Sequence, residues 1–375
     1  MRVLLIGGEP FDYTIAFANA VASRMPVTLI VPRDRFAAAL PFFDPQVTVR
    51  LIDWPRHRSL ANLAFLWQLT RLIRAEAPDL IHVLSNTHLW LNLAVPLWRP
   101  VPVITTVHDV SLHPGDRDTA VLPGWAPRLM ARLSRHVVVH GPTLARAAQR
   151  VFDIPGDRIH ILPHPAIRRY ADLAVATQPD QTDRSDAFDV LLFGRIFAYK
   201  GLDQLIRAEH LLGDRIPGLR ITIAGRGDDP HALRALMGDP GRYVIHNRFI
   251  PDAEVAALFR ATDLVVLPYT EASQSGVLPV AATFGVPAVV TDVGELRATV
   301  LPHHLGLVVP PNDPAALAEA IARLAQDPAL RGRHGDAARA WAAGAIGADR
   351  VGTLAENLYA DVHQKAKRAG SKGWA

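Results

Sequence analysis

Short apolar runs of strand length alternate with longer amphipathic runs along the whole chain. In the first half the amphipathic runs have helical spacing, and the apolar runs are nearly continuous, as in a parallel sheet covered on both faces. This alternation predicts a doubly wound α/β domain. The strand-like runs are 3–6, 27–31, 47–52, 80–83, 103–107 and 137–139, and the helix-like runs include 13–24, 61–76 and 142–151.

The pattern stops at 171–187, which is polar, lacks periodicity and contains a proline, so we interpret it as a linker. It then restarts, which predicts a second α/β domain over 188–348 after a first over 1–170. A final helix over 349–375 is a candidate to pack back on the first domain. We expect a cleft between the carboxyl edges of the two sheets, where such sheets bind ligands. The second-half strands are expected at 190–193, 219–224, 243–246, 264–267, 288–291 and 307–309, and the helices at 202–212, 231–237, 253–261, 277–284 and 315–326.

Composition supports two folded domains. The chain has 375 residues, 49% of them hydrophobic and 20% charged, which is enough to bury two cores. It contains no cysteine, so disulfides and thiolate metal sites are excluded and a reducing cytosol is the expected compartment. The apolar run after Arg2 is too short for a signal peptide, and no run of about 18 apolar residues predicts a membrane-spanning helix.

Positive charge is concentrated in the first half. Residues 1–180 hold 19 Arg against 14 Asp and Glu, although the whole chain carries only +4. Nucleic acid, anionic lipid and a phosphorylated acceptor are the candidate partners. No nucleic-acid-binding motif occurs, so we expect no nucleic acid.

Trp and Arg occur together in two segments of this half. Such pairs are typical of a membrane interface, although ordinary core and surface packing also explains them. The sequence therefore predicts a protein of the cytoplasm, with peripheral attachment to the inner face of the plasma membrane as a hypothesis. The residues concerned are Trp54, Arg56, His57, Arg58, Trp67, Arg71 and Arg74, and then Trp98, Arg99, Trp125, Arg128, Arg132 and Arg135.

The segment 193–201 follows a strand and opens a helix. Gly194 lets the backbone turn towards a ligand, and Arg195 and Lys200 then stand at a helix N-terminus, which already favours anions. Together the two cations are suited to hold a diphosphate. A solvated pair of basic residues is the alternative.

Two further turns occupy strand ends in the second half. Glu271 follows the run 264–267, where a carboxylate can accept hydrogen bonds from sugar hydroxyls, although an ordinary charge near a helix start is the alternative. The amides of Ser275 and Gly276 can hold phosphate oxygens. Gly225 lies in a glycine-rich turn that is weak evidence by itself.

In order and spacing, these pieces resemble the C-terminal half of family 4 glycosyltransferases over about 150 residues. The matching motifs are Gly-Arg-x4-Lys-Gly at 194–201, Ala-Gly-x-Gly at 224–227, Asp-Leu-Val-Val-Leu-Pro at 263–268, Glu-x-Ser-x-Ser-Gly at 271–276 and the run 285–294.

This resemblance implies a GT-B fold, with two Rossmann-like domains, and a retaining transfer from a nucleotide sugar without an essential metal. Arg195 and Lys200 match the diphosphate-binding pair of the family, and Glu271 matches the first Glu of its E-x7-E motif, which contacts the donor sugar. The candidate substrate-binding residues of this half are Gly194, Gly225, Ile250, Ser273, Gln274, Ser275, Gly276 and Val277.

One position departs from the family. The second Glu of E-x7-E, which typically binds the ribose, falls at Pro279. Either another group holds the ribose, or the nucleotide preference differs, or the protein binds without catalysis. Proline in the first turn of a helix is compatible with the fold.

In the first half, His108 follows the run 103–107 and is similar to the histidine of the family's N-terminal domain, so it is our catalytic candidate there. Asp109 is its candidate orienting partner. Gly7 and Gly8 form a strand-to-helix turn that could reach the diphosphate or the acceptor, but they are not part of a G-x-G-x-x-G dinucleotide motif. His160 and His164 have a metal-compatible spacing without a carboxylate to complete a site. We therefore predict neither metal nor cofactor.

The sequence thus predicts a glycosyltransferase of polysaccharide biosynthesis. It would move a sugar from a UDP- or GDP-sugar to a glycan or lipid-linked acceptor, with retention. The alternatives are a non-catalytic nucleotide-sugar or glycan-binding partner of a transferase, and a nucleotide-sugar epimerase on the same fold.

Overall fold

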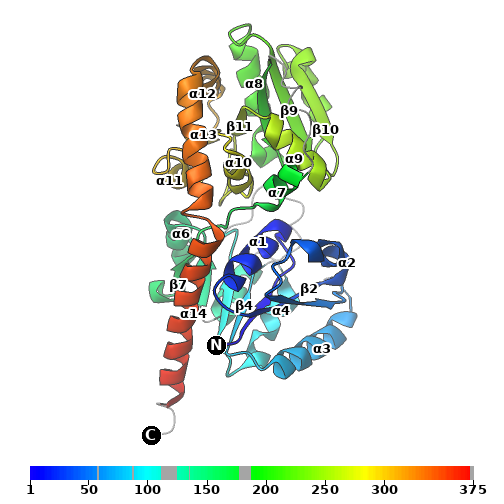
Figure 1. Ribbon diagram of the computed structural model, residues 1–375, viewed down its shortest axis with the longest axis vertical. Helices are drawn as coiled ribbons and strands as arrows, with labels where there is room; N and C mark the ends of the chain where they lie inside the picture. Colours follow the sequence, from blue (N-terminus) through cyan, green and yellow to red (C-terminus); the bar gives the residue numbers. More distant parts are fainter. Residues whose placement is uncertain (57–58, 87, 111–124, 135, 177–186, 372–375) are drawn as a thin grey trace. The chain divides into compact units, whose positions relative to one another are not determined.

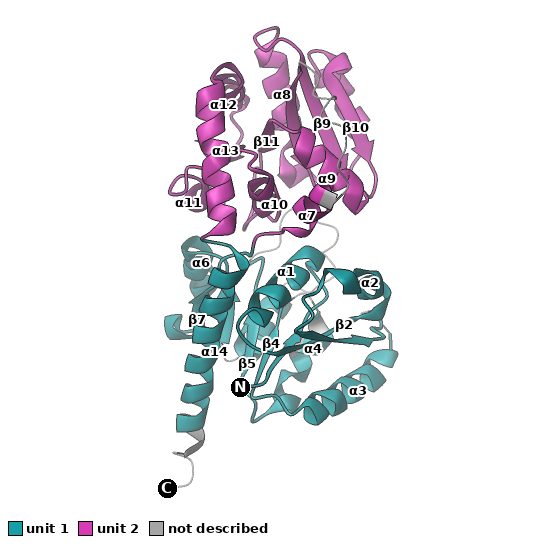
Figure 2. Ribbon diagram, viewed as in Figure 1, with its two compact units in different colours: residues 1–112, 118–165, 345–375 teal, residues 113–117, 166–344 magenta. Residues whose placement is uncertain are grey.

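The computed structural model describes residues 1–375 except 57–58, 87, 111–124, 135, 177–186 and 372–375. The described residues form two compact units, which Figure 2 colours separately. Unit 1 comprises 1–112, 118–165 and 345–375, and unit 2 comprises 113–117 and 166–344. Each unit contains one parallel sheet between helices. Among the described residues, no helix combines the length and the apolar character needed to cross a bilayer.

The sheet of unit 1 has seven strands in the described part of the chain, in the order β3-β2-β1-β4-β5-β6-β7. Every paired strand runs parallel. The expected strands are present, and the short β7 is added. Their bounds are β1 Val3–Ile6, β2 Val27–Pro32, β3 Val47–Ile52, β4 Leu80–Val83, β5 Val103–Thr106, β6 His136–Val139 and β7 Ile159–Ile161.

Alternation along β1 explains why its sequence is apolar throughout. Val3 and Leu5 enter a core shared with α1 and α14, whereas Leu4 and Ile6 enter a core shared with α3 and α4. Successive side chains of a strand point to opposite faces, so a sheet covered on both faces needs apolar residues at every position. The helical elements of unit 1 are α1 Phe11–Ala22, α2 Arg33–Phe36, η1 Ala37–Phe42, α3 Ala61–Glu76, α4 Leu89–Ala94, η2 Val95–Trp98, α5 Ala126–Leu133, α6 Pro142–Phe152, η3 Gly156–Arg158 and α14 Ala348–Ser371.

The last helix, α14, packs on α1 in unit 1 (Figure 1). Its Tyr359 is fully buried, and the hydroxyl lies 2.7 Å from Nδ1 of His82 in β4. Nε2 of His82 lies 2.8 Å from Oγ1 of Thr106 in β5. A buried polar chain therefore joins the C-terminal helix to the middle of the sheet.

We expect Tyr359→Phe to lower the free energy of unfolding of unit 1 by about 1–2 kcal/mol, because it leaves a buried nitrogen of His82 without its partner. Urea denaturation followed by circular dichroism measures the change. An unaltered unfolding free energy would show that the bond to His82 does not hold α14.

The sheet of unit 2 has six parallel strands in the described residues, in the order β10-β9-β8-β11-β12-β13. Its core lies between this sheet and helices such as α8 and α12. The strands are β8 Phe188–Phe193, β9 Leu219–Gly225, β10 Tyr243–Asn247, β11 Leu264–Leu267, β12 Ala288–Thr291 and β13 Gly306–Val309. The helical elements are α7 Arg169–Ala176, η5 Ala198–Lys200, α8 Leu202–Leu212, η6 Pro230–Leu236, η7 Pro240–Arg242, α9 Asp252–Ala261, α10 Val277–Phe284, α11 Leu296–Val300, α12 Pro314–Gln326 and α13 Pro328–Ala343.

The range expected to be a linker begins inside a helix. α7 packs on α9, and the guanidinium of Arg169 is paired with the Asp252 carboxylate, with one N–O distance of 3.0 Å. The sequence pattern does not predict this ion pair, because Arg169 and Asp252 are 83 positions apart. The rest of the expected linker, 177–186, lies outside the described residues.

Candidate active site

Strand order places a ligand-binding position in each sheet. In unit 2 the chain runs outwards from β8 to β10 and then returns to the other side of β8 as β11. The loops after β8 and β11 therefore diverge at a topological switch point, which is where open α/β sheets bind ligands. Those two loops carry Arg195, Lys200 and Glu271.

Lys200 is held against aromatic rings. Its Nζ lies 3.8 Å from the ring centroid of Tyr269 and 5.0 Å from that of Tyr199. The faces of these rings attract the ammonium group and keep it in place. The backbone amide of Thr270 donates to the carbonyl of Tyr199 at 2.9 Å, so the loop after β11 is tied to the loop after β8.

Gly201 brings these loops close together. It has φ +69°, and a Cβ at this position would lie 1.8 Å from the carbonyl oxygen of Pro268. A side chain is thus excluded by backbone conformation and by contact. Gly201 is also the N-cap of α8, so the same residue turns the chain into the helix that follows Lys200.

Arg195 also contacts Tyr199. Its guanidinium donates to the Tyr199 hydroxyl at 3.2 Å and lies 5.5 Å from the ring centroid of Phe197. Arg195 is exposed, whereas Lys200 is half-buried. The structure therefore brings the two predicted cations to one buried aromatic residue that the sequence analysis had not singled out.

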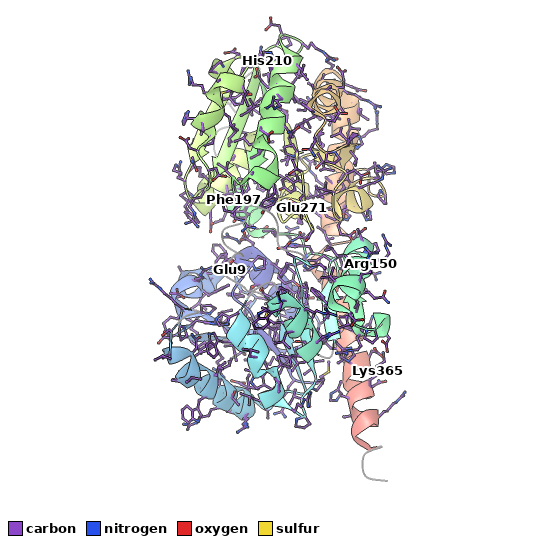
Figure 3. The ribbon with its side chains drawn as sticks, turned by 180° about the vertical axis from the view of Figure 1, so that it is seen from behind. Glu9, Arg150, Phe197, His210, Glu271 and Lys365 are labelled. Carbon is purple, nitrogen blue, oxygen red and sulfur yellow. The ribbon has the colours of Figure 1, made fainter. Side chains whose placement is uncertain are left out.

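The Glu271 loop is ordered by its own hydroxyls. Ser275 is buried, and its Oγ lies 3.2 Å from the Tyr269 hydroxyl. The same Oγ accepts from the backbone amide of Val277, the first residue of α10, at 3.2 Å. Ser273 is buried, and Glu271, Gln274 and Gly276 are half-buried. Figure 3 labels Glu271 and Phe197 at one end of unit 2 and His210 at the other.

The remaining candidates of unit 2 lie at the ends of neighbouring strands. Gly194 follows β8, Gly225 ends β9, and the amide of Gly194 donates to the carbonyl of Ala224 at 2.9 Å. Ile250 is buried in the connection between β10 and α9. All three candidates belong to the carboxyl edge of the sheet.

Unit 1 has its switch point between β1 and β4, and a cavity of about 390 Å³ opens there. Gly7 and Gly8 line it, as expected of a strand-to-helix turn. The indole of Trp54 donates to Nε2 of His88 at 2.5 Å inside this cavity. The other lining residues are Ile6, Glu9, Pro32, Asp34, Arg35, Pro55, Arg56, Val83, Ser85 and Leu91.

His108 is buried beyond the end of β5, with both ring nitrogens in use. Nε2 donates to the carbonyl of Leu84 at 2.9 Å, and Nδ1 lies 2.9 Å from Nε2 of His140. Burial lowers the pKa of His108, and the nearby charge of Asp109 opposes that shift only in part. The Nε2–H group of the ring is thus bound to Leu84 rather than to Asp109, and in the neutral ring the unprotonated Nδ1 faces His140. A hydrogen bond from Nε2 to a donor sugar requires the bond to Leu84 to open.

His140 and Tyr13 complete this cluster. Nδ1 of His140 donates to the carbonyl of Leu162 at 3.0 Å. The ring of Tyr13 contacts those of His108, His140 and His164, with centroid distances of 4.6, 5.2 and 5.1 Å. Nothing in the sequence pattern pairs His140 with His108, because only the strand order brings the two together.

Comparison with known proteins agrees with this arrangement. A family model described as Glycosyltransferase Family 4 matches residues 12–166, and one described as Glycosyl transferases group 1 matches residues 187–327. The D-inositol 3-phosphate glycosyltransferase of Pseudarthrobacter chlorophenolicus is 31% identical over 71% of this chain and 68% of its own. The chain belongs to glycosyltransferase family 4.

Other similar proteins cover more of the chain. The D-inositol 3-phosphate glycosyltransferase of Xylanimonas cellulosilytica is 27% identical over 94% of this chain and 91% of its own. Anabaena HepE, solved in complex with UDP, has a TM-score of 0.70 at 18% identity and covers 96% of this chain and 100% of its own. The predicted GT-B fold is confirmed, and so is the prediction of a glycosyltransferase.

Two features of this family 4 enzyme follow from its own residues. Pro279 is the third residue of α10, in the first turn, where a backbone amide has no partner inside the helix, so the helix forms despite the proline. His160 and His164 do not come together. His160 hydrogen-bonds His136 at 3.0 Å, whereas His164 packs on Tyr13. Within the described ranges, no group of three or more His, Cys, Asp or Glu is arranged to hold a metal ion.

Proposed function

We propose that this family 4 glycosyltransferase takes a sugar from a nucleoside diphosphate sugar and transfers it to a hydroxyl of a glycan or lipid-linked acceptor. The observation that carries the donor class is the convergence of Arg195 and Lys200 on Tyr199, beside the Glu271 loop. Two cations at one switch point match the charge of a diphosphate. The UDP complex of the structural relative HepE supports this class.

The chemistry assigned to each residue follows from its charge. Lys200 and Arg195 stabilise the negative charge that develops on the departing diphosphate, so we propose that neither a metal ion nor a cofactor is required. Glu271 accepts hydrogen bonds from the donor sugar, and the amides near Ser275 and Gly276 support the phosphate oxygens. We propose retention of configuration, and His108 is the candidate group on unit 1 once its Nε2 exchanges the Leu84 carbonyl for a sugar hydroxyl.

The unit 1 cavity is the proposed acceptor site. Its charged lining residues in the described chain are Glu9, Asp34, Arg35 and Arg56, and Glu9 and Arg35 form an ion pair. Balanced charge around an indole, Trp54, suits a hydroxyl-rich acceptor.

Calorimetric titration with UDP, GDP, ADP and their sugar conjugates tests the donor site. We expect one nucleotide to bind and Arg195→Ala to weaken it about 10- to 100-fold, the value of a lost charge-assisted hydrogen bond. Arg234→Ala, which removes an exposed arginine of η6 in the same unit, is the matched control. Absence of binding by every nucleotide, or equal weakening in the control, would refute the proposed site.

We further propose that unit 1 contacts an anionic membrane, on the inner face of the plasma membrane, through α3. The outward side of this helix carries Leu60, Leu63 and Trp67, followed by Arg71 and Arg74, all of which are exposed. Two other tryptophans that the sequence analysis considered for a membrane interface have different roles in the structure. Trp98 is buried and donates to Thr70, and Trp54 lies in the cavity, so neither is available to a membrane.

Flotation with anionic and with zwitterionic liposomes tests this contact. We expect binding to the anionic liposomes only. Each arginine near the surface contributes about 1 kcal/mol, so a variant with both Arg71→Ala and Arg74→Ala should bind the liposomes about 30-fold more weakly. Arg128→Ala, Arg132→Ala is the control, because both of these arginines are paired with Asp153. Equal flotation with zwitterionic liposomes would exclude the electrostatic contact.

A further inference from the structure

A second cavity of about 390 Å³ lies at the amino edge of the unit 1 sheet. It is bounded by the chain entering β5, the end of α5, the start of β6 and the C-terminal part of α14. This is the opposite edge from Gly7, Gly8 and His108, which follow the carboxyl ends of their strands. The lining residues are Val95, Arg99, Pro100, Val101, Pro102, Val103, Leu133, His136, Lys365 and Ala366.

The lining combines an apolar wall with positive charge. Among the described residues that line the cavity, Arg99 and Lys365 are cationic, His136 is protonatable, and none is acidic. Lys365 also pairs with Asp361, one turn earlier in α14, at 2.8 Å. An ammonium group has three donors, so this ion pair leaves Lys365 able to bind an anion in the cavity.

The pKa of His136 reflects the burial and the positive charge around this cavity. The pKa of His136 is lowered to about 4, mainly by burial and to a smaller extent by His160, Arg158 and Lys365. Asp361 is the group that acts in the opposite direction. An imidazole in this surrounding stays neutral until a negative charge arrives beside it.

Exposed apolar residues lie close to the cavity lining in the sequence. Leu93 and Leu97 flank the lining residue Val95 in α4 and η2, and they are 39% and 54% exposed. Exposed leucines beside clustered cations match a molecule that has both an acyl chain and an anionic group.

We propose that this cavity binds the phosphodiester headgroup of an anionic amphiphile, with Arg99 and Lys365 on the phosphate and the acyl part against the Val95–Leu97 surface. The site goes beyond the proposed reaction, since its position at the opposite edge leaves the donor and acceptor residues untouched. Its test needs no glycosyl transfer, so it can fail independently of the proposed function.

Proton uptake distinguishes this site from a general attraction to a basic surface. A bound phosphodiester raises the pKa of His136, so binding takes up a proton at pH values between the free value, about 4, and the ordinary value of 6.5. A phosphodiester keeps its single charge over this range. The affinity for the phosphodiester therefore increases as the pH falls. This increase comes from protonation of His136, because the charge of the ligand does not change.

Isothermal titration of the full chain with dihexanoyl phosphatidylglycerol, below its micellar concentration, tests the proposal. We expect binding that is about 10-fold or more weaker in Arg99→Ala and in Lys365→Ala, because each loses a charge-assisted contact. Lys367→Ala is the matched control, since it removes a lysine of the same helix that does not line the cavity. His136→Gln should still bind at about pH 8 but should lose the buffer-dependent heat of proton uptake at about pH 5.5.

Three results would overturn the proposal. The first is absence of binding to the lipid, and the second is equal weakening by Lys367→Ala and Lys365→Ala. The third comes from glycerophosphoglycerol, the same headgroup without chains, because equal affinity for this probe would assign the site to a soluble phosphate ester. Circular dichroism of each variant checks that the fold is retained.

Discussion

Lys200→Ala is expected to lower the turnover of glycosyl transfer by about 100- to 1000-fold, the usual cost of removing one group that stabilises charge in a transition state. The ammonium group is preorganised over Tyr269 and held by a loop that Gly201 fixes against Pro268, so it needs little rearrangement when charge develops on the diphosphate. Steady-state kinetics with the nucleotide sugar identified by calorimetry measure kcat and KM separately.

Lys200→Met is the matched variant, because it keeps an apolar stem against the aromatic rings and removes the charge alone. We expect it to be as slow as Lys200→Ala, with thermal unfolding close to that of the parent protein. Turnover near the parent value in both variants would remove Lys200 from the mechanism. Recovery in Lys200→Met would show instead that packing on Tyr269 is what matters.

Unit 1 is expected to lose stability steeply below pH 6.5. Burial lowers the pKa of His82 to about 3 and that of His164 to about 4, from the ordinary value of 6.5 that applies to the unfolded chain. The unfolded state therefore binds more protons than the folded state below pH 6.5. The contribution of these two histidines to stability is fully present above pH 6.5. It is lost as the pH falls from 6.5 towards their pKa values in the folded protein.

Each such histidine costs about 1.4 kcal/mol per pH unit, so these two remove about 5 kcal/mol between pH 6.5 and roughly pH 4.5. That is comparable with the whole stability of a typical domain. Urea unfolding at a series of pH values measures the slope. We expect His164→Gln to reduce it by up to one proton, whereas His231→Gln, at an exposed position in unit 2, leaves it unchanged. A flat stability profile from pH 7 to about pH 5 would contradict this account.

The sequence predicted correctly those features that depend on a single short segment of the chain. The central strands are continuous apolar runs, and Arg195, Lys200 and Glu271 lie in short motifs directly after two of them. β7 was missed because it has three residues with a histidine in the middle. The roles of the site residues and the placement of the two units stay predictions.

Other features depend on partners that are distant in the chain. α13 was not predicted because it contains Gly332 and Gly335, which normally disfavour a helix. In the structure a Cβ at Gly335 would lie 2.6 Å from the carbonyl oxygen of Gly285, so glycine lets α13 approach the end of α10. In the same way, nothing near His108 in the sequence indicates that Leu84 and His140 occupy its ring nitrogens.

Because α14 belongs to unit 1, unit 1 can complete its fold only after all of unit 2 has been synthesised. Most of unit 1 is synthesised before unit 2, yet Tyr359 and the rest of α14 are made after all of unit 2. Until then, the apolar side of α1 that packs on α14 has no cover. The nascent chain thus carries a complete second half beside an unfinished first half, and an mRNA truncated before 345 would yield an aggregation-prone product.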